Sequence, residues 1–231
     1  MKIEVWSDFV CPYCFLGKRH LELALEKFAH KNKVIVKFKS YQLNDPKEKH
    51  EEVFVQDVLA KKYRRPKEEI EMMNNQLKEQ AKEVGLSFNF EKLLHIHTFD
   101  VHRLVKYAES IHLDEPFITY LFEAYFTDNE NINDQSTLLA IAKKAGMDEE
   151  KTIEIMETCK YTQAVNEDIE IAKDMNVQGV PFFVINEKYA LTGAQPVDAF
   201  LGVLEKIWGE EGSVFSQTTK GTNFCCGDEC E

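Results

Sequence analysis

The first 43 residues carry the pattern of two β-strands separated by an amphipathic helix. Residues 2–7 alternate apolar and charged side chains, and residues 34–43 are rich in β-branched and aromatic ones. Residues 15–30 repeat apolar side chains at helical spacing, and Pro12 suits a first helical position because it lacks an N–H. This order predicts a βαβ unit with parallel strands.

The rest of the chain has first a helical and then a strand-forming pattern. Asp134 and Gly146 suit the N-cap and C′ positions of one predicted helix. Strands return at residues 179–186 and 189–192, and a closing helix is predicted at residues 197–208. The earlier predicted helices span residues 51–63, 67–84, 99–110, 115–126, 135–145, 148–157 and 161–175.

Each end of this pattern is too small to bury a sheet alone, which favours one α/β domain built from both ends. Residues 1–45 and 176–208 together predict a four-stranded mixed sheet with helices on its faces, in the order βαβ…ββα. Residues 46–175 then form a large inserted all-helical domain, and the polar residues 209–231 are predicted to be a flexible tail.

Charge and hydropathy disfavour several kinds of partner. The 231 residues include 28 basic and 40 acidic side chains, and this formal net charge of −12 disfavours binding to a nucleic-acid backbone. No apolar run reaches the ~18 residues that a membrane span requires, and the N-terminus lacks the apolar stretch of a signal peptide. We expect a cytoplasmic protein with no nucleic-acid or membrane partner, in a compartment where thiols are mostly reduced.

A Cys-x-x-Cys segment, Cys11-Pro12-Tyr13-Cys14, lies between the first predicted strand and helix. Two cysteines in a first helical turn can close a disulfide with little backbone movement. Free backbone N–H groups and the helix dipole stabilise a thiolate at the first position, so Cys11 is predicted to attack and Cys14 to resolve the mixed disulfide. The competing interpretation is half of a zinc site, but a second ligand pair at suitable spacing is absent from the sequence.

Val180-Pro181-Phe182 is a second unusual segment, because a proline at the start of a strand normally weakens it. One explanation is a cis Val180–Pro181 bond in a tight turn, which would leave the backbone of Val180 free to pair with an extended peptide or thiol substrate. The alternative is an ordinary proline on an edge strand.

Five segments carry a resemblance to a known family. They are Ser-Asp-Phe-Val-Cys-Pro-Tyr-Cys-Phe-Leu-Gly at 7–17, Thr-Phe-Asp-Val-His-Arg-Leu at 98–104, Leu-Phe-Glu-Ala-Tyr-Phe at 121–126, Gly-Val-Pro-Phe-Phe at 179–183 and Gly-Ala-Gln-Pro at 193–196. Together they resemble the DsbA-family thioredoxin-fold oxidoreductases, most closely the FrnE-like branch. The resemblance implies a thioredoxin-like fold with an inserted helical domain, thiol–disulfide exchange at Cys11 and Cys14, and a cis proline at Pro181 facing them.

The resemblance also implies an activity. It indicates a protein disulfide oxidoreductase whose redox-active disulfide Cys11–Cys14 replaces any bound cofactor. Its partners would be protein or small thiol/disulfide substrates and a reductant or oxidant that recycles it. We expect a reductase or isomerase rather than an oxidase, because the Pro-Tyr dipeptide resembles glutaredoxin sites and periplasmic oxidants of the family usually carry a signal peptide.

In the related kappa glutathione-transferase and hydroxychromene-carboxylate isomerase branch, serine is typical at the first cysteine position, so Cys11 argues against that activity. Substrate docking is expected at Pro12, Tyr13, Val180 and Pro181.

Auxiliary residues are weaker predictions. Glu4 is similar to a buried acid that assists proton movement in relatives, or else it is a solvent-facing strand residue. His102 and Arg103 lie in a family-like segment and are candidates for lining the cleft, although such residues on a helix are more often structural. Cys159 is predicted to be a small buried hydrophobic residue within a helix.

The C-terminal cysteines Cys225, Cys226 and Cys230 allow three interpretations. They form a second dithiol that exchanges with Cys11 and Cys14, a soft-metal site of thiolates, or a tail without a role. The first agrees with the resemblance, since some FrnE-like relatives carry a C-terminal cysteine pair. The alternatives for the whole chain are a cysteine-based metal-binding or stress-response protein and a glutathione-dependent small-molecule thiol enzyme.

Overall fold

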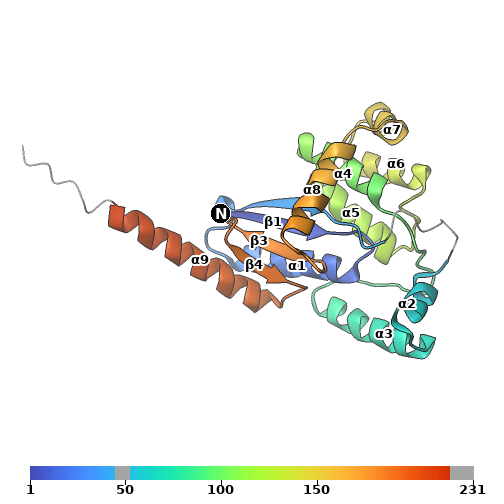
Figure 1. Ribbon diagram of the computed structural model, residues 1–231, viewed down its shortest axis with the longest axis horizontal. Helices are drawn as coiled ribbons and strands as arrows, with labels where there is room; N and C mark the ends of the chain where they lie inside the picture. Colours follow the sequence, from blue (N-terminus) through green and yellow to red (C-terminus); the bar gives the residue numbers. More distant parts are fainter. Residues whose placement is uncertain (45–52, 219–231) are drawn as a thin grey trace, which may run out of the picture.

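The protein is built on a four-stranded mixed sheet in the order β2-β1-β3-β4 (Figure 1). The computed structural model describes residues 1–44 and 53–218. β1 (Lys2–Ser7) pairs in parallel with β2 (Ile35–Ser40) and antiparallel with β3 (Phe182–Ile185), which in turn pairs antiparallel with β4 (Tyr189–Thr192). The predicted parallel βαβ unit and C-terminal hairpin are therefore confirmed.

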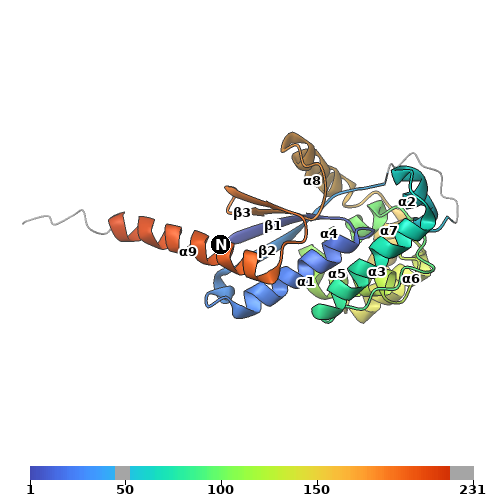
Figure 2. The same ribbon diagram turned by 90° about the horizontal axis from the view of Figure 1, so that it is seen from below.

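Helices cover both faces of this sheet, as Figure 2 shows. α1 (Pro12–Lys27) and α9 (Val197–Thr218) pack on one face, against the buried side chains of Ile3 and Val5. α8 (Thr162–Asp174) packs on the other face, where Trp6 contacts Ala172. Alternate residues of β1 thus face different helices, because successive strand side chains point to opposite sides.

The inserted helices lie beyond the carboxyl end of β1, around the N-terminus of α1 (Figures 1 and 2). α8 belongs to the predicted insertion by sequence position, yet it covers the sheet. The helices between β2 and α8 are α2 (Val55–Tyr63), α3 (Lys67–Glu83), α4 (Phe99–Ser110), α5 (Asp114–Phe126), α6 (Gln135–Lys144) and α7 (Glu149–Glu157).

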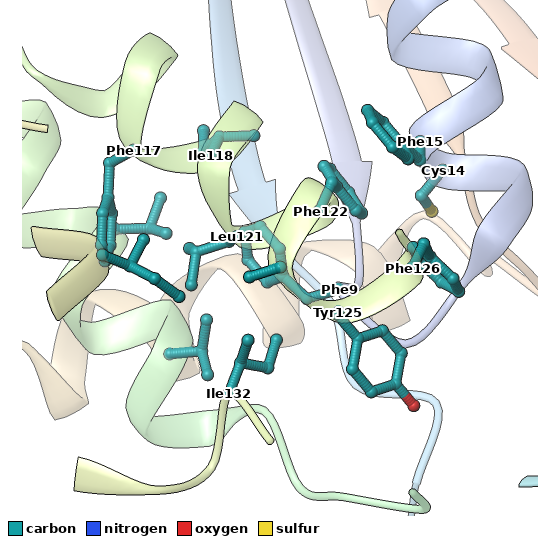
Figure 3. Close-up of a cluster of buried hydrophobic side chains, with 14 of the residues drawn as sticks. Phe9, Cys14, Phe15, Phe117, Ile118, Leu121, Phe122, Tyr125, Phe126 and Ile132 are labelled. Carbon is teal, nitrogen blue, oxygen red and sulfur yellow. The ribbon is translucent and has the colours of Figure 1, made fainter. Parts of the chain in front are cut away.

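An aromatic core joins α1 to the inserted helices (Figure 3). The ring of Phe15 on α1 stacks on Phe122 of α5, with centroids 5.0 Å apart, and Phe126 packs beside both. Phe122 and Phe126 are fully buried. The start of α1 is therefore enclosed by the insertion, while the rest of α1 lies on the sheet.

A buried charge network holds α8 to the sheet and to α4. Asp168 is 3% exposed and accepts hydrogen bonds from the Ser40 N–H and from Lys39, each at 2.9 Å. The Lys106 ammonium of α4 lies 2.5 Å from the same carboxylate. Burial would raise the pKa of Asp168, but the two lysines and these hydrogen bonds hold it below its ordinary value.

Two sequence predictions are wrong. α9 continues to Thr218 instead of ending at 208, and the Tyr189 hydroxyl donates a hydrogen bond to Glu210, which ties the start of this extension to β4. Cys159 is exposed rather than buried, because α7 ends at Glu157 and the residue falls in the connection to α8. None of the helices in the described part of the chain has the length and apolar character needed to span a bilayer.

Candidate active site

Both cysteines of the Cys-x-x-Cys segment lie in the first turn of α1. β1 ends at Ser7, and the turn that follows is closed by a 3.1 Å hydrogen bond from the Cys11 N–H to the Asp8 carbonyl. Cys11 is the N-cap residue, Pro12 begins the helix as predicted, and the Cys14 N–H donates to the Cys11 carbonyl at 3.0 Å. Both side chains are free thiols.

The Cys11 thiol faces the turn before β3. Its Sγ donates a hydrogen bond to the Val180 carbonyl at 3.4 Å, and the Val180–Pro181 peptide bond is cis. Gly17 allows this approach, because a Cβ there would lie only 3.0 Å from Cγ of Pro181. Two segments separated by 169 positions in the sequence are thus brought together at one sulfur.

Cys14 lies deeper than Cys11. It is 2% exposed and belongs to the same core as Phe15, Phe122 and Phe126 (Figure 3). Burial, followed by the hydrogen bond and charge of Cys11, raises the pKa of the Cys14 thiol well above its ordinary value. The Ser7 side chain and the Asp8 backbone act in the opposite direction and lower the pKa of Cys14.

A cavity of about 210 Å³ opens beside Cys11. Its walls come from the Cys11-Pro12-Tyr13 segment, from α2 and α3, and from the end of α5. Tyr13 is 48% exposed and also borders a wider hollow of about 700 Å³ that reaches Val180. The apolar lining of the smaller cavity includes Val10, Leu43, Val55, Val58, Leu59, Tyr63, Met73, Leu77, Phe90, Leu93, Tyr125 and Phe126.

A buried carboxylate supports the turn before Cys11. Asp8 is fully buried and accepts hydrogen bonds from the Thr98 hydroxyl and the Leu43 N–H, each at 2.7 Å. Burial, and secondarily the charge of Asp8, raises the pKa of the Tyr125 hydroxyl. We did not predict a role for Asp8 from the sequence, although its position between a strand and a cysteine pair was a usable signal.

His102 lies next to this carboxylate but does not line the cavity. Its Nε2 is 3.6 Å from Oδ1 of Asp8, its ring packs on Phe9 with centroids 5.2 Å apart, and the side chain is buried. Among the described residues, Nε2 has no hydrogen-bond partner. The structure therefore brings His102 to the turn before Cys11 rather than into the cavity lining.

Arg103 and Glu4 lie away from the thiols. Arg103 donates hydrogen bonds to the carbonyls of Ile155, Thr158 and Lys160, so it holds the α7–α8 connection. Glu4 lies on the sheet face that α8 covers, 3.7 Å from the Lys39 ammonium. The structure assigns both residues to packing and charge pairing.

Cys225, Cys226 and Cys230 fall outside the described residues. Within residues 1–44 and 53–218, no group of three or more His, Cys, Asp or Glu side chains is arranged to hold a metal ion. The geometry around Cys11 and Cys14 is that of two adjacent thiols, one bordering a cavity and one enclosed behind it.

Comparisons with known proteins agree with this geometry. Residues 2–205 match the sequence model of the DSBA-like thioredoxin domain. The chain is 26% identical to the uncharacterized protein YwbO of Bacillus subtilis (strain 168) over 200 residues, which are 86% of this chain and 92% of that protein. A probable DsbA oxidoreductase from Streptomyces coelicolor superimposes with a TM-score of 0.87 and 32% identity over 91% of each chain. The cytosolic disulfide reductase DsbM of Pseudomonas aeruginosa shares the fold, with a TM-score of 0.65 and 15% identity over 90% of this chain and 98% of that one.

Proposed function

The chain belongs to the family of DSBA-like thioredoxin domains, and from this membership we propose that it is a thiol–disulfide oxidoreductase acting through Cys11 and Cys14. The observation that carries the proposal is the unequal placement of the two thiols. Cys11 borders the cavity and caps α1, whereas Cys14 is enclosed by aromatic rings. A substrate disulfide therefore meets Cys11 first.

The exchange needs no bound cofactor. The Cys11 thiolate attacks one sulfur of a substrate disulfide, the substrate S–S bond breaks, and the departing thiolate takes up a proton. Cys14 then loses its proton and attacks the Cys11 sulfur, which forms the Cys11–Cys14 disulfide and releases the second substrate thiol. The substrate gains two electrons and the cysteine pair loses two, so an external thiol reductant must restore the pair before the next turnover.

The cavity supports a substrate with an apolar group close to its disulfide. Its lining is mainly aliphatic and aromatic, and its exposed rim includes Tyr13, Tyr63 and Met73. A volume of about 210 Å³ suits a single large side chain or a small ring system. We assign this cavity to the group that flanks the substrate disulfide, and the Val180 carbonyl to the sulfur bound at Cys11.

The direction of exchange belongs to the same proposal. We assign reduction or isomerisation, which the Pro12-Tyr13 dipeptide between the two cysteines supports, because it resembles the dipeptide of glutaredoxin sites. The measurement is the equilibrium of the Cys11–Cys14 pair with glutathione. A potential near that of a strong oxidant, about −120 mV, would overturn this direction and leave the exchange chemistry intact.

Three serine variants test the proposal. Cys11→Ser should abolish reduction of a disulfide peptide, because the attacking sulfur is lost. Cys14→Ser should accumulate a mixed disulfide between Cys11 and the peptide, visible by mass spectrometry as a reductant-sensitive adduct. Cys159→Ser is the matched control, since this exposed thiol is remote from the cavity lining, and its turnover should equal that of the wild type. Turnover that survives in Cys11→Ser would refute the proposal.

A further inference from the structure

Ser7 is the last residue of β1 and directly precedes the turn that leads to the cysteine pair. It is the partner of Ser40 on β2, and alternation along the strand places its side chain on the same sheet face as Ile3 and Val5. α1 covers that face, and Cys14 is in the first turn of α1. The Ser7 side chain therefore points toward the helix that carries the cysteines.

The Ser7 hydroxyl is buried and lacks an ordinary partner. The residue is 3% exposed, and within the described chain its Oγ has no hydrogen-bond partner. A buried hydroxyl without a hydrogen bond costs free energy, so such groups call for an explanation. The Ser7 side chain lowers the pKa of the Cys14 thiol, in the helix that covers this face, although the described structure shows no hydrogen bond between them.

The surroundings of Cys14 leave few other groups to stabilise its anion. α5 contributes the apolar rings of Phe122 and Phe126 to this core, and the charge of Cys11 on α1 raises the pKa of Cys14 (Figure 3). The Asp8 carboxylate in the β1–α1 turn is already engaged by Thr98 and Leu43, while the Asp8 backbone favours the Cys14 anion. The groups that lower the pKa of Cys14 are thus the Asp8 backbone and the Ser7 side chain.

We propose that Ser7 is the hydrogen-bond donor that stabilises the Cys14 thiolate while it resolves the mixed disulfide. The inference rests on the proposed function, because it concerns the second step of that exchange. As Cys14 gives up its proton and attacks the Cys11 sulfur, the Cys11–substrate bond breaks, the Cys11–Cys14 bond forms, and the substrate leaves as a thiol. Ser7 supplies no electrons and keeps its proton, and its unpartnered hydroxyl donates a hydrogen bond as negative charge develops on the Cys14 sulfur.

The test is a single-turnover experiment on the full chain with a disulfide peptide, in which attack and resolution are timed separately. Ser7→Ala should leave the rate of mixed-disulfide formation unchanged and slow resolution about tenfold, which corresponds to about 1.4 kcal/mol of barrier. The pH of half-maximal resolution should rise by about one unit, because a thiolate without its donor forms at higher pH. Ser7→Thr keeps a hydroxyl and should resolve at nearly the wild-type rate.

Ser40→Ala is the matched control, since Ser40 is 2% exposed at the same level of the neighbouring strand. It should change neither step. If threonine is not accommodated at position 7, thiolate absorbance provides a second measurement: in a Cys11→Ser background, adding Ser7→Ala should shift the Cys14 titration to higher pH.

Several results would overturn the inference. They are an unshifted titration of Cys14, wild-type resolution in Ser7→Ala, and equal slowing in Ser7→Ala and Ser40→Ala. The failure of the proposed function is a different result: no variant, nor the wild type, would form a mixed disulfide at Cys11.

Discussion

Gly17 offers a direct test of how the cysteine helix is positioned against the turn before β3. A Cβ added at Gly17 would lie 3.0 Å from Cγ of Pro181, 3.4 Å from Cζ of Phe183 and 3.5 Å from Cα of Ala194. The first distance requires the Pro181 ring to move by a few tenths of an ångström. Since Cys11 hydrogen-bonds to the Val180 carbonyl, Gly17→Ala should displace the neighbouring peptide from the attacking sulfur.

Two opposing contributions set the size of the effect on stability. Alanine favours a helix interior over glycine by about 1 kcal/mol. Overpacking against a closely packed neighbour costs about 1–3 kcal/mol. The free energy of unfolding should therefore fall by about 0–2 kcal/mol, and the melting temperature by about 2–4 °C for each kcal/mol in a chain of this size.

The effect on activity follows from geometry. A misplacement of about 1 Å at a reacting centre can cost about 100-fold in rate, so a shift of a few tenths of an ångström should lower kcat/KM about two- to fivefold. Gly202→Ala in α9 is the control, because apart from its chain neighbours and its own helix backbone no described atom lies within 4 Å of the added Cβ. It should stabilise the protein by about 0.5–1 kcal/mol and leave the exchange rate unchanged.

The measurements are urea unfolding of both variants with equal m-values and the rate of reduction of a disulfide peptide. The two alanine variants should differ by about 1–3 kcal/mol, the cost of the Pro181 contact. If Gly17→Ala is as stable as Gly202→Ala and retains full activity, the reasoning is refuted, because the α1–Pro181 contact would then neither resist the methyl group nor position the thiol.

Three further predictions concern the cavity and the buried polar groups. Met73→Lys should raise KM for a peptide with an apolar flank roughly fivefold, the equivalent of about 1 kcal/mol of lost burial. Met72→Lys, next to it and outside the cavity lining, should leave KM unchanged, and equal effects of the two variants in steady-state kinetics would contradict substrate binding in the cavity. Tyr125→Phe removes the 2.7 Å hydrogen bond to the Leu94 carbonyl and should lower the urea-derived unfolding free energy by about 1–3 kcal/mol, so an unchanged value would argue against that bond. Asp168→Asn should cost about 3 kcal/mol near neutral pH. The folded-state pKa of Asp168 is depressed, so its contribution to stability is present above the unfolded value of about 3.9 and is lost as the pH falls through the folded value. A difference in unfolding free energy between the two proteins that does not shrink as the pH is lowered below about 3.9 would contradict this.

Local sequence patterns predicted the secondary structure well because the relevant signals act within a few residues. The alternation of apolar and charged side chains predicted β1, which spans Lys2–Ser7, and Pro12 predicted the start of α1. The Asp134 side chain accepts hydrogen bonds from the N–H groups of Ser136 and Thr137, as expected of an N-cap, and Gly146 has a left-handed backbone with φ of 87°. The DsbA family inferred from short segments is confirmed, and the FrnE-like branch stays a prediction.

The errors concern contacts between distant segments. Cys159 follows a helical pattern, but the carbonyls of Ile155 and Thr158 are held by Arg103 from α4, and α7 ends before the cysteine. The extension of α9 includes a contact between Glu210 and the hairpin. Successive side chains of a strand point to opposite faces of the sheet, so Glu4 lies on the face of Trp6 and not on the face that α1 covers.

The inserted helices and the sheet contribute differently to the two thiols. The β1–α1 turn and the turn before β3 fix where Cys11 lies, and both belong to the sheet domain. Burial is the largest cause of the raised pKa of Cys14, and the rings of Phe122 and Phe126 in its core come from the insertion. α2 and α3 likewise wall the cavity. Substitutions in the inserted helices can therefore change the pKa of Cys14 and the fit of the substrate, while the sheet domain keeps the two sulfur atoms in place. The ionisation of the thiols and their positions are thus determined by different parts of the chain.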